Sequence, residues 1–298
     1  MKLLITGGSG FLGRNIIHLL SRKYEVESLG LSEIDTYNVD ISKEIPVFKS
    51  KFNIVVHAAG KVHVIPENKN ENQLFYDVNV QGTKNLCTAL ETNGLPDNFI
   101  FISTVAVYGL DCGEGISEEH PLNGKTPYAH SKIQAENILT DWCAKLNIPL
   151  TILRPSLIAG PNPPGNLGAM IDGIKSGKYL RIGKGQTRKS ILMAEDIALL
   201  IPKLIQTSGV YNVCDNNHPS LLELENLLST QLGKRLPLSI PVWLAKIFAK
   251  IGDLAGGKLP FDTSKLNKLT NTLTFSNEKA KKDLDWKPLD VLTNYKVR

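Results

Sequence analysis

The sequence predicts an α/β protein built on a doubly wound parallel sheet, followed by a smaller mixed domain. Short apolar runs alternate with segments whose apolar residues recur at helical spacing, an order typical of parallel strands joined by helices. The first run, residues 2–5, ends in a cluster of glycines that leads directly into a helical pattern. Two later runs, residues 52–59 and 98–104, are apolar almost throughout, as expected for strands that are covered on both faces.

The glycine cluster near the amino terminus carries the first indication of function. Gly7, Gly10 and Gly13 are spaced G-x-x-G-x-x-G between the first strand and a helix that we expect to run to Leu20. The exposed N–H groups at a helix start attract a pyrophosphate, and glycines allow the phosphate to approach closely. An ordinary strand–helix turn is the alternative, because such triplets also occur by chance. The position directly after a short strand favours a dinucleotide site.

Five more elements complete the predicted sheet domain. We expect strands at 24–29 and 150–153, a short strand or turn at 37–41, and helices at 77–91 and from Thr126 to about Lys145. Thr126 followed by Pro127 is a favourable helix start, because threonine suits the N-cap and proline the first helical position. Arg154 and Pro155 should stop the last of these strands.

The character of the sequence changes after Pro155, and we place a domain boundary there. Residues 1–155 form the predicted dinucleotide-binding domain, residues 156–298 form mainly a substrate domain, and residues 190–215 return to the first domain. Glycines and prolines between positions 159 and 168 predict a loop.

Two helices are predicted in the second domain. Residues 220–223 have the pattern of a capping box, and Gly233 should end the helix that begins there. Residues 241–251 predict an amphipathic helix. We expect this helix to pack on the rest of the protein rather than lie on a membrane surface, because its polar face carries few charges.

Composition and charge narrow the class of partner. The chain has 298 residues, of which 42% are hydrophobic and 21% charged, as in ordinary globular proteins. The net charge of +5 is spread along the chain, and its densest basic patch, residues 279–282, is flanked by acids. We therefore expect no nucleic-acid partner, whereas an anionic small molecule suits this charge.

The cysteines and the hydropathy pattern indicate where the protein works. Cys87, Cys112, Cys143 and Cys214 lie far apart, so they predict neither a metal site nor a disulfide framework. Residue 2 already begins the first strand, which leaves no room for a signal peptide. No stretch of about 18 apolar residues predicts a membrane span. We expect a reduced, cytoplasmic protein.

A tyrosine and a lysine carry the second functional indication. Tyr128 and Lys132 are four residues apart in a predicted helix and so lie on one face. A nearby ammonium should lower the pKa of the phenol from about 10 toward the working range of a base. This pair also occurs by chance in many helices. Thr104, at the carboxyl end of a predicted strand, strengthens the case because open α/β sheets bind ligands at that edge.

Further motifs accompany these residues in order along the chain. They are H-A-A-G at 57–60, N-V-Q-G-T at 79–83, S-T-V-A-V-Y-G at 103–109, L-R-P at 153–155, A-E-D-I-A at 194–198 and L-D-W-K-P at 284–288. Together with the glycine triplet and Y-x-x-x-K, they resemble the extended short-chain dehydrogenase/reductases, and specifically the NAD-dependent epimerase/dehydratase group that acts on nucleotide sugars. The resemblance covers nearly the whole chain and implies a Rossmann-type sheet.

The resemblance also implies roles for individual residues. Tyr128 would be the catalytic acid/base, Thr104 its hydroxyl partner, and Lys132 would bind the nicotinamide ribose. NAD or NADP would contact Gly7, Gly10, Phe11, Leu12, Gly13, Asp40, Ile41, Ala58, Ala59, Gly60, Asn79, Ser103, Tyr128, Lys132 and Pro155. Arg181 and Arg188 are candidates for the substrate diphosphate, since guanidinium matches phosphate, and Asn162 is a further substrate candidate. Solvated surface arginines are the alternative.

Two departures from the family pattern affect these expectations. NAD enzymes place an acid at the end of the second strand, but here Glu33 and Asp35 come slightly late in the sequence and no arginine stands there. The choice between NAD and NADP therefore stays open. Nucleotide-sugar dehydratases carry Asp-Glu directly after the catalytic threonine, whereas this chain has Val105 and Ala106. We therefore disfavour dehydratase activity.

An epimerase and a 4-ketoreductase remain as the expected enzymes. Both move hydride at C4 of a sugar, here expected to be UDP-linked. Residues 57–65 and the stretch 236–288 resemble enzymes of bacterial surface-polysaccharide synthesis. His63 could touch substrate, although a loop histidine or a core histidine with satisfied hydrogen bonds is favoured.

Two further expectations concern other classes of behaviour. A non-catalytic NAD(P)-binding redox sensor is the alternative to an enzyme, and the intact set of Thr104, Tyr128 and Lys132 argues against it. The resemblance implies a possible homodimer through the helices at 77–91 and 127–145.

Overall fold

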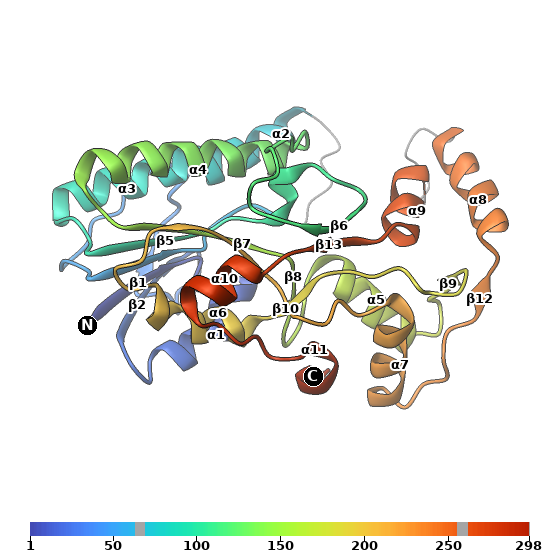
Figure 1. Cartoon of the computed structure of the whole chain (residues 1–298). Helices are drawn as coiled ribbons and strands as arrows, with labels where there is room; N and C mark the ends of the chain where they lie inside the picture. The colour runs from blue at the N-terminus through green and yellow to red at the C-terminus, as the bar shows by residue number, and fades with distance from the viewer. Residues whose placement is uncertain (63–68, 255–261, 298) are drawn as a thin grey trace.

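A seven-stranded sheet forms the centre of the structure, a computed structural model that describes residues 1–62, 69–254 and 262–297 (Figure 1). Neighbouring strands are all parallel within it. In spatial order the strands are β11 (Gly209–Val213), β7 (Leu150–Pro155), β5 (Asn98–Ile102), β4 (Ile54–His57), β1 (Lys2–Thr6), β2 (Glu25–Gly30) and β3 (Tyr37–Asn38). The chain starts at β1 and winds outward in both directions, which confirms the predicted doubly wound fold.

Helices cover both faces of this sheet (Figure 1). One face carries α1 (Phe11–Leu20), α6 (Ala194–Leu200) and α10 (Glu278–Leu284), and the other carries α3 (Gly82–Asn93) and α4 (Pro127–Leu146). Leu3 and Ile5 of β1 enter the core on the α1 side, whereas Leu4 enters the core on the α4 side. Successive side chains of a strand point to opposite faces, so a strand buried on both faces is apolar throughout.

The predicted elements differ from the structure in three places. Strand β7 continues through Arg154 and Pro155, where we expected it to stop. Pro155 is tolerated because it is the last residue of the strand, and the next N–H, that of Ser156, bonds to the Val213 carbonyl oxygen at 3.1 Å.

The two other differences concern helices. The helix predicted at 77–91 opens with a π-helical turn, η1 (Asp77–Gln81), and follows a helix that the sequence did not indicate, α2 (Lys69–Tyr76). The predicted loop at 159–168 is shorter than expected, because α5 (Gly165–Lys175) begins inside it. The capping box is confirmed: Ser220 and Glu223 bond reciprocally at the start of α7 (Leu221–Gln231).

Most of the remaining elements lie beyond the carboxyl ends of the central strands (Figure 1). Three strand pairs, all parallel, are β6 (Gly113–Ile116) with β13 (Leu273–Phe275), β8 (Leu157–Ala159) with β10 (Ile191–Met193), and β9 (Arg181–Ile182) with β12 (Ser239–Ile240). The remaining helices are η2 (Val105–Tyr108), η3 (Ile201–Leu204), α8 (Val242–Leu254), α9 (Thr263–Thr270) and α11 (Val291–Asn294). Helices α5, α7 and α11 share a core with β10.

Helix α8 contradicts the expectation that its apolar face packs on the protein. Trp243 is 64% exposed and Phe248 is 51% exposed, whereas Ala245 and Ala249 are fully buried. The helix therefore turns small residues inward and large apolar residues outward. Within the described part of the chain, no helix combines the length and hydropathy needed to cross a bilayer.

Candidate active site

The glycine turn after β1 is tightly folded against the end of β4. Gly7 has a φ of +75°, which favours glycine, and a Cβ on it would lie 2.9 Å from the backbone of Ala59. A Cβ on Gly13 would overlap the carbonyl oxygens of Gly7 and Gly8. Gly10 is the N-cap of α1 and offers no side chain to its first N–H groups. The turn thus presents backbone donors with no side chain over them, as a pyrophosphate site requires.

Asp35 lies against this turn, although its place in the sequence appeared to come late for the end of β2. A Cβ on Gly8 would overlap Asp35 Oδ1, and a Cβ on Gly30 would overlap Oδ2. A turn in which the Asp35 N–H bonds to the Ser32 carbonyl oxygen at 2.9 Å brings the carboxylate back to the strand end. Sequence counting missed this residue because the turn shortens the path in space.

Tyr128 and Thr104 bring two hydroxyls together at the carboxyl end of β5. Thr104 comes two residues after the end of β5, caps η2, and its Oγ1 accepts from the Ala106 N–H at 3.1 Å. Tyr128 is in the first turn of α4, which Thr126 caps as predicted. The Thr104 side chain lies close enough to the Tyr128 phenol to lower its pKa. Two residues far apart in sequence therefore form one hydroxyl pair.

The expected lowering of the Tyr128 pKa by Lys132 is not found. Burial raises the pKa of Tyr128 to about 12, and the Thr104 side chain opposes this rise only partly. The Lys132 ammonium donates instead to the Ile102 carbonyl oxygen at 2.7 Å and lies 4.5 Å from the centroid of the Phe101 ring. Burial lowers the pKa of Lys132 to about 8. In this arrangement Tyr128 is a phenol at neutral pH and suits the role of an acid.

Asn79 connects the loop after β4 to the catalytic helix. Its Oδ1 accepts from the Lys61 N–H at 2.7 Å, and its Nδ2 donates to Ser131 Oγ at 2.8 Å. A Cβ on Gly60 would lie 3.1 Å from Asn79 Oδ1 and 3.4 Å from Lys132 Nζ. The loop of Ala58, Ala59 and Gly60 is thereby held beside Lys132.

The residues at this edge of the sheet fit a dinucleotide. The first N–H groups of α1 have no side-chain cap, as a diphosphate site requires, and Asp35 lies beside the turn, where ribose hydroxyls are bound in such folds. Ser156, directly after Pro155, has a buried Oγ with no hydrogen-bond partner among the residues that the structure describes. A ligand would supply that partner. No group of three or more His, Cys, Asp or Glu residues in this described part could hold a metal ion.

Comparison with known proteins agrees with this geometry. Residues 3–214 match the model of the NAD dependent epimerase/dehydratase family, which is more than half of the chain. The chain belongs to this family. The resemblance seen in the sequence is therefore confirmed.

Relatives of this family include sugar 4-epimerases. The chain is 28% identical over 297 residues to the N-acetyl-alpha-D-glucosaminyl-diphospho-ditrans,octacis-undecaprenol 4-epimerase of Escherichia coli O157:H7, over 94% of this chain and 88% of that protein. It is 28% identical to the UDP-glucose 4-epimerase of Vibrio cholerae, over 98% of this chain and 92% of that protein. The fold matches that of the UDP-glucose 4-epimerase of Thermotoga maritima bound to UDP-glucose, with a TM-score of 0.76, 19% identity, and coverage of 98% and 95%.

Asp40 and Ile41, which the resemblance assigned to the cofactor, each contact other parts of the protein. Asp40 accepts from the Ser42 N–H at 3.1 Å and its hydroxyl at 2.6 Å, which lowers the pKa of the carboxyl. Ile41 is buried in the core below α3, against Gly82. Asp40 thus remains near the surface, and Ile41 contributes to packing.

The two candidate substrate arginines are engaged in ion pairs. Arg181 in β9 is mostly buried and contacts the fully buried Glu225 at 3.3 Å. Arg188 donates to the His218 carbonyl oxygen at 2.8 Å and lies 3.6 Å from Glu223. The sequence predicted that Arg181 either binds the substrate diphosphate or is a solvated surface residue. In the structure it is instead paired with Glu225.

The two remaining substrate candidates are Asn162 and His63. Asn162 is exposed between β8 and α5, with a φ of +54°. His63 lies outside the described residues. The structure thus gathers Thr104, Tyr128, Lys132, Asn79 and the glycine turn at one edge of the sheet, but it shows no contact between them and Arg181 or Asn162.

A buried histidine that the sequence analysis passed over supports the glycine turn. His57 Nδ1 lies 2.6 Å from Thr6 Oγ1, and its Nε2 lies 2.9 Å from Thr83 Oγ1. Thr83 donates to the Asn79 carbonyl oxygen at 2.7 Å, so it accepts from His57, which then accepts from Thr6. Thr6 Oγ1 in turn accepts from the Ala59 N–H at 3.0 Å. The histidine therefore orders the ends of β1 and β4.

A buried acid extends the face of α4 that carries Tyr128 and Lys132. Glu136 follows Tyr128 and Lys132 at the same four-residue spacing, which is the signal that could have identified it. Its carboxylate accepts from the hydroxyl of Ser103 and pairs with Arg154 of β7. The predicted site residue Ser103 is thus engaged with α4.

Proposed function

We propose that the protein is an NAD-dependent 4-epimerase that acts on C4 of a UDP-linked sugar. The neighbouring hydroxyls of Tyr128 and Thr104, at the sheet edge that carries the glycine turn, are the observation that supports this most. Tyr128 exchanges a proton with the C4 hydroxyl of the sugar, and Thr104 orients both oxygens. Lys132 holds the ribose of the cofactor from its place beside Gly60.

The cofactor completes the chemistry. When bound, NAD would supply hydride transfer to and from C4 of the sugar, and Lys132 with the glycine turn would hold it. As a phenol, Tyr128 suits the half of the cycle in which the C4 oxygen of the ketosugar receives a proton, and the other half requires its phenolate. Asp35 supports NAD over NADP, because a carboxylate at that place binds ribose hydroxyls and repels a 2′-phosphate. Val105 and Ala106 after Thr104 supply no acid or base for water elimination, which argues against a dehydratase.

The test is turnover of purified protein. We expect interconversion of UDP-GlcNAc and its C4 epimer without added reductant. A 4-ketoreductase would instead consume NADH or NADPH with UDP-4-keto-6-deoxy-GlcNAc. A protein that binds NAD but turns over no sugar diphosphate would point to the redox sensor and contradict the proposal.

A second substrate class is a sugar carried on a polyprenyl diphosphate. It presents the same sugar and diphosphate chemistry at the active site, and the relative from Escherichia coli O157:H7 is named for such a substrate. The outward apolar face of α8 favours this class, because the carrier is a lipid. The test is epimerisation of polyprenyl-diphospho-GlcNAc presented in detergent or vesicles.

We also propose which ligand each domain binds and how the protein dimerises. Residues 1–155, together with 190–215, bind the dinucleotide, and residues 156–298 mainly bind the sugar. The protein forms a homodimer through α3 and α4, and it works in the cytoplasm, where its four free cysteines stay reduced. Light scattering of the full chain tests the dimer.

A further inference from the structure

Helix α8 has the reverse of the pattern expected for a surface helix. Its buried side is made of small residues, Ala245, Ala249 and Gly252, which share a cluster with Leu266 of α9. Its outward residues are large and apolar: Trp243 is 64% exposed, Ile247 47%, Phe248 51%, Ile251 48% and Leu254 88%. An ordinary amphipathic helix buries its large apolar residues and exposes polar ones. The outward stripe therefore needs an apolar neighbour.

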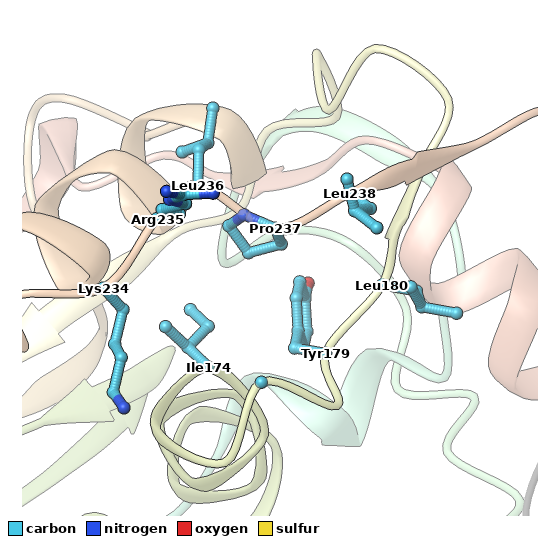
Figure 2. Close-up of a pocket in the computed structure, with 9 residues that line it drawn as sticks. Ile174, Tyr179, Leu180, Lys234, Arg235, Leu236, Pro237 and Leu238 are labelled. Atoms are coloured by element: carbon cyan, nitrogen blue, oxygen red, sulfur yellow. The ribbon is translucent and has the colours of Figure 1, made fainter.

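The position of α8 allows a flat neighbour to reach this stripe. The helix lies at the edge of the molecule, on the side remote from the glycine turn and the central sheet (Figure 1). Strand β12 leads into it, and the preceding Leu238 is 77% exposed. Leu238 and Leu180 lie on one side of a cavity of about 340 Å³, and Lys234 and Arg235 lie on the other (Figure 2). Exposed Leu238 thus adds apolar surface to the segment that leads into the helix.

The charges on α8 indicate what kind of neighbour it is. Lys246 and Lys250 are exposed and follow Trp243 and Ile247 by three residues, so they border one side of the apolar stripe. The acid of this helix, Asp253, accepts from the N–H of Thr263 at 3.1 Å and from its hydroxyl, which turns it toward α9. The outward surface of α8 is therefore apolar with a cationic border.

We propose that α8 docks in the interfacial region of an anionic lipid bilayer. Large apolar side chains enter the boundary of the acyl chains, Trp243 suits the interface, and lysines reach anionic headgroups. The net charge of +5 acts in the same direction. A protein partner or a second copy would satisfy the apolar stripe, but the cationic border favours anionic lipid.

Docking of this kind has a use in the second substrate class named above. A sugar on a polyprenyl diphosphate stays at the bilayer surface, so an enzyme held there by α8 meets it directly. This use rests on the proposed function, whereas the contact between α8 and lipid does not.

The test is co-flotation of the full-length protein with vesicles. We expect binding to phosphatidylcholine vesicles that contain phosphatidylglycerol, and weaker binding to phosphatidylcholine alone. The double substitution Ile247→Ser and Phe248→Ser should weaken binding by about tenfold or more, and Lys246→Glu with Lys250→Glu should remove the preference for anionic vesicles. The matched control is Val47→Ser, which changes an apolar residue that is 84% exposed and outside α8.

Two further measurements separate the outcomes. Trp243 fluorescence should shift to the blue on anionic vesicles, and Trp243→Phe should abolish the shift. Circular dichroism and turnover of a water-soluble UDP-sugar should be unchanged in the α8 variants, which shows that they fold. Absence of flotation with either vesicle, or a dimer that these variants dissociate, overturns the proposal. Inert UDP-sugars with intact flotation would instead overturn the proposed function alone.

Discussion

Arg154 donates two hydrogen bonds to Glu136 in the interior of the protein, from Nε to Oε1 at 3.1 Å and from Nη2 to Oε2 at 2.6 Å. The side chains are 6% and 4% exposed. Arg154 also donates to the Tyr108 hydroxyl at 3.1 Å, and Tyr108 donates to Asn212 of β11 at 2.6 Å. This network ties the helix that carries Tyr128 to the ends of β7 and β11.

The buried pair gives a prediction on stability. Glu136→Ala leaves the Arg154 charge buried without its partner, so the free energy of unfolding should fall by about 3–5 kcal/mol. Urea unfolding measures the loss. The control is Glu278→Ala, which breaks an exposed pair with Lys281 and should cost about 1 kcal/mol or less. Equal losses in the two variants would show that burial does not govern the energetics of the Glu136 pair.

Tyr128→Phe tests the acid/base role. The variant keeps the ring and its packing against Phe75 but removes the hydroxyl, so sugar turnover should fall by about 10²–10⁴-fold while NAD affinity is retained. Kinetics and cofactor titration measure the two effects separately. Tyr76→Phe, which changes a hydroxyl beside exposed His130, should leave turnover unchanged. Full activity of Tyr128→Phe would remove this residue from the mechanism.

Asp35→Asn tests cofactor choice. Loss of the carboxylate removes charge-assisted bonds to ribose hydroxyls and the repulsion of a 2′-phosphate, so the preference for NAD over NADP should fall by about tenfold. Titration with both cofactors gives the ratio. Glu33→Gln, two residues away and exposed, serves as the control and should keep the original ratio. An unchanged ratio in Asp35→Asn would place the ribose elsewhere.

His57 gives a prediction on pH. Burial lowers the pKa of His57 from 6.5 to about 3, so below pH 6.5 the unfolded chain binds a proton that the folded chain does not. Stability from this group is therefore present above pH 6.5 and is lost as the pH falls toward 3. Unfolding by urea across this range should show the loss, and His57→Gln should flatten it. The same slope in both proteins would assign acid sensitivity to other groups.

Much of the fold was predictable because local patterns specify it. The strand, glycine turn and helix at residues 2–20, the cap at Thr126 and the capping box at Ser220 depend on neighbouring residues, and the structure confirms them. The helical spacing of Tyr128 and Lys132 predicted a shared face in the same way. Periodicity and capping are properties of adjacent residues, so a sequence states them directly.

Tertiary structure decided the properties that depend on distant residues. A turn of the chain places Asp35 beside the glycine turn. The Lys132 ammonium donates to the Ile102 carbonyl oxygen. Burial raises the pKa of Tyr128, whereas the sequence predicted that Lys132 would lower it. Helix α8 was predicted, but the direction of its apolar face was not. The reason is physical: solvation, charge pairing and the covered side of a helix depend on which groups the fold brings together, and residues next to each other in the chain do not determine that.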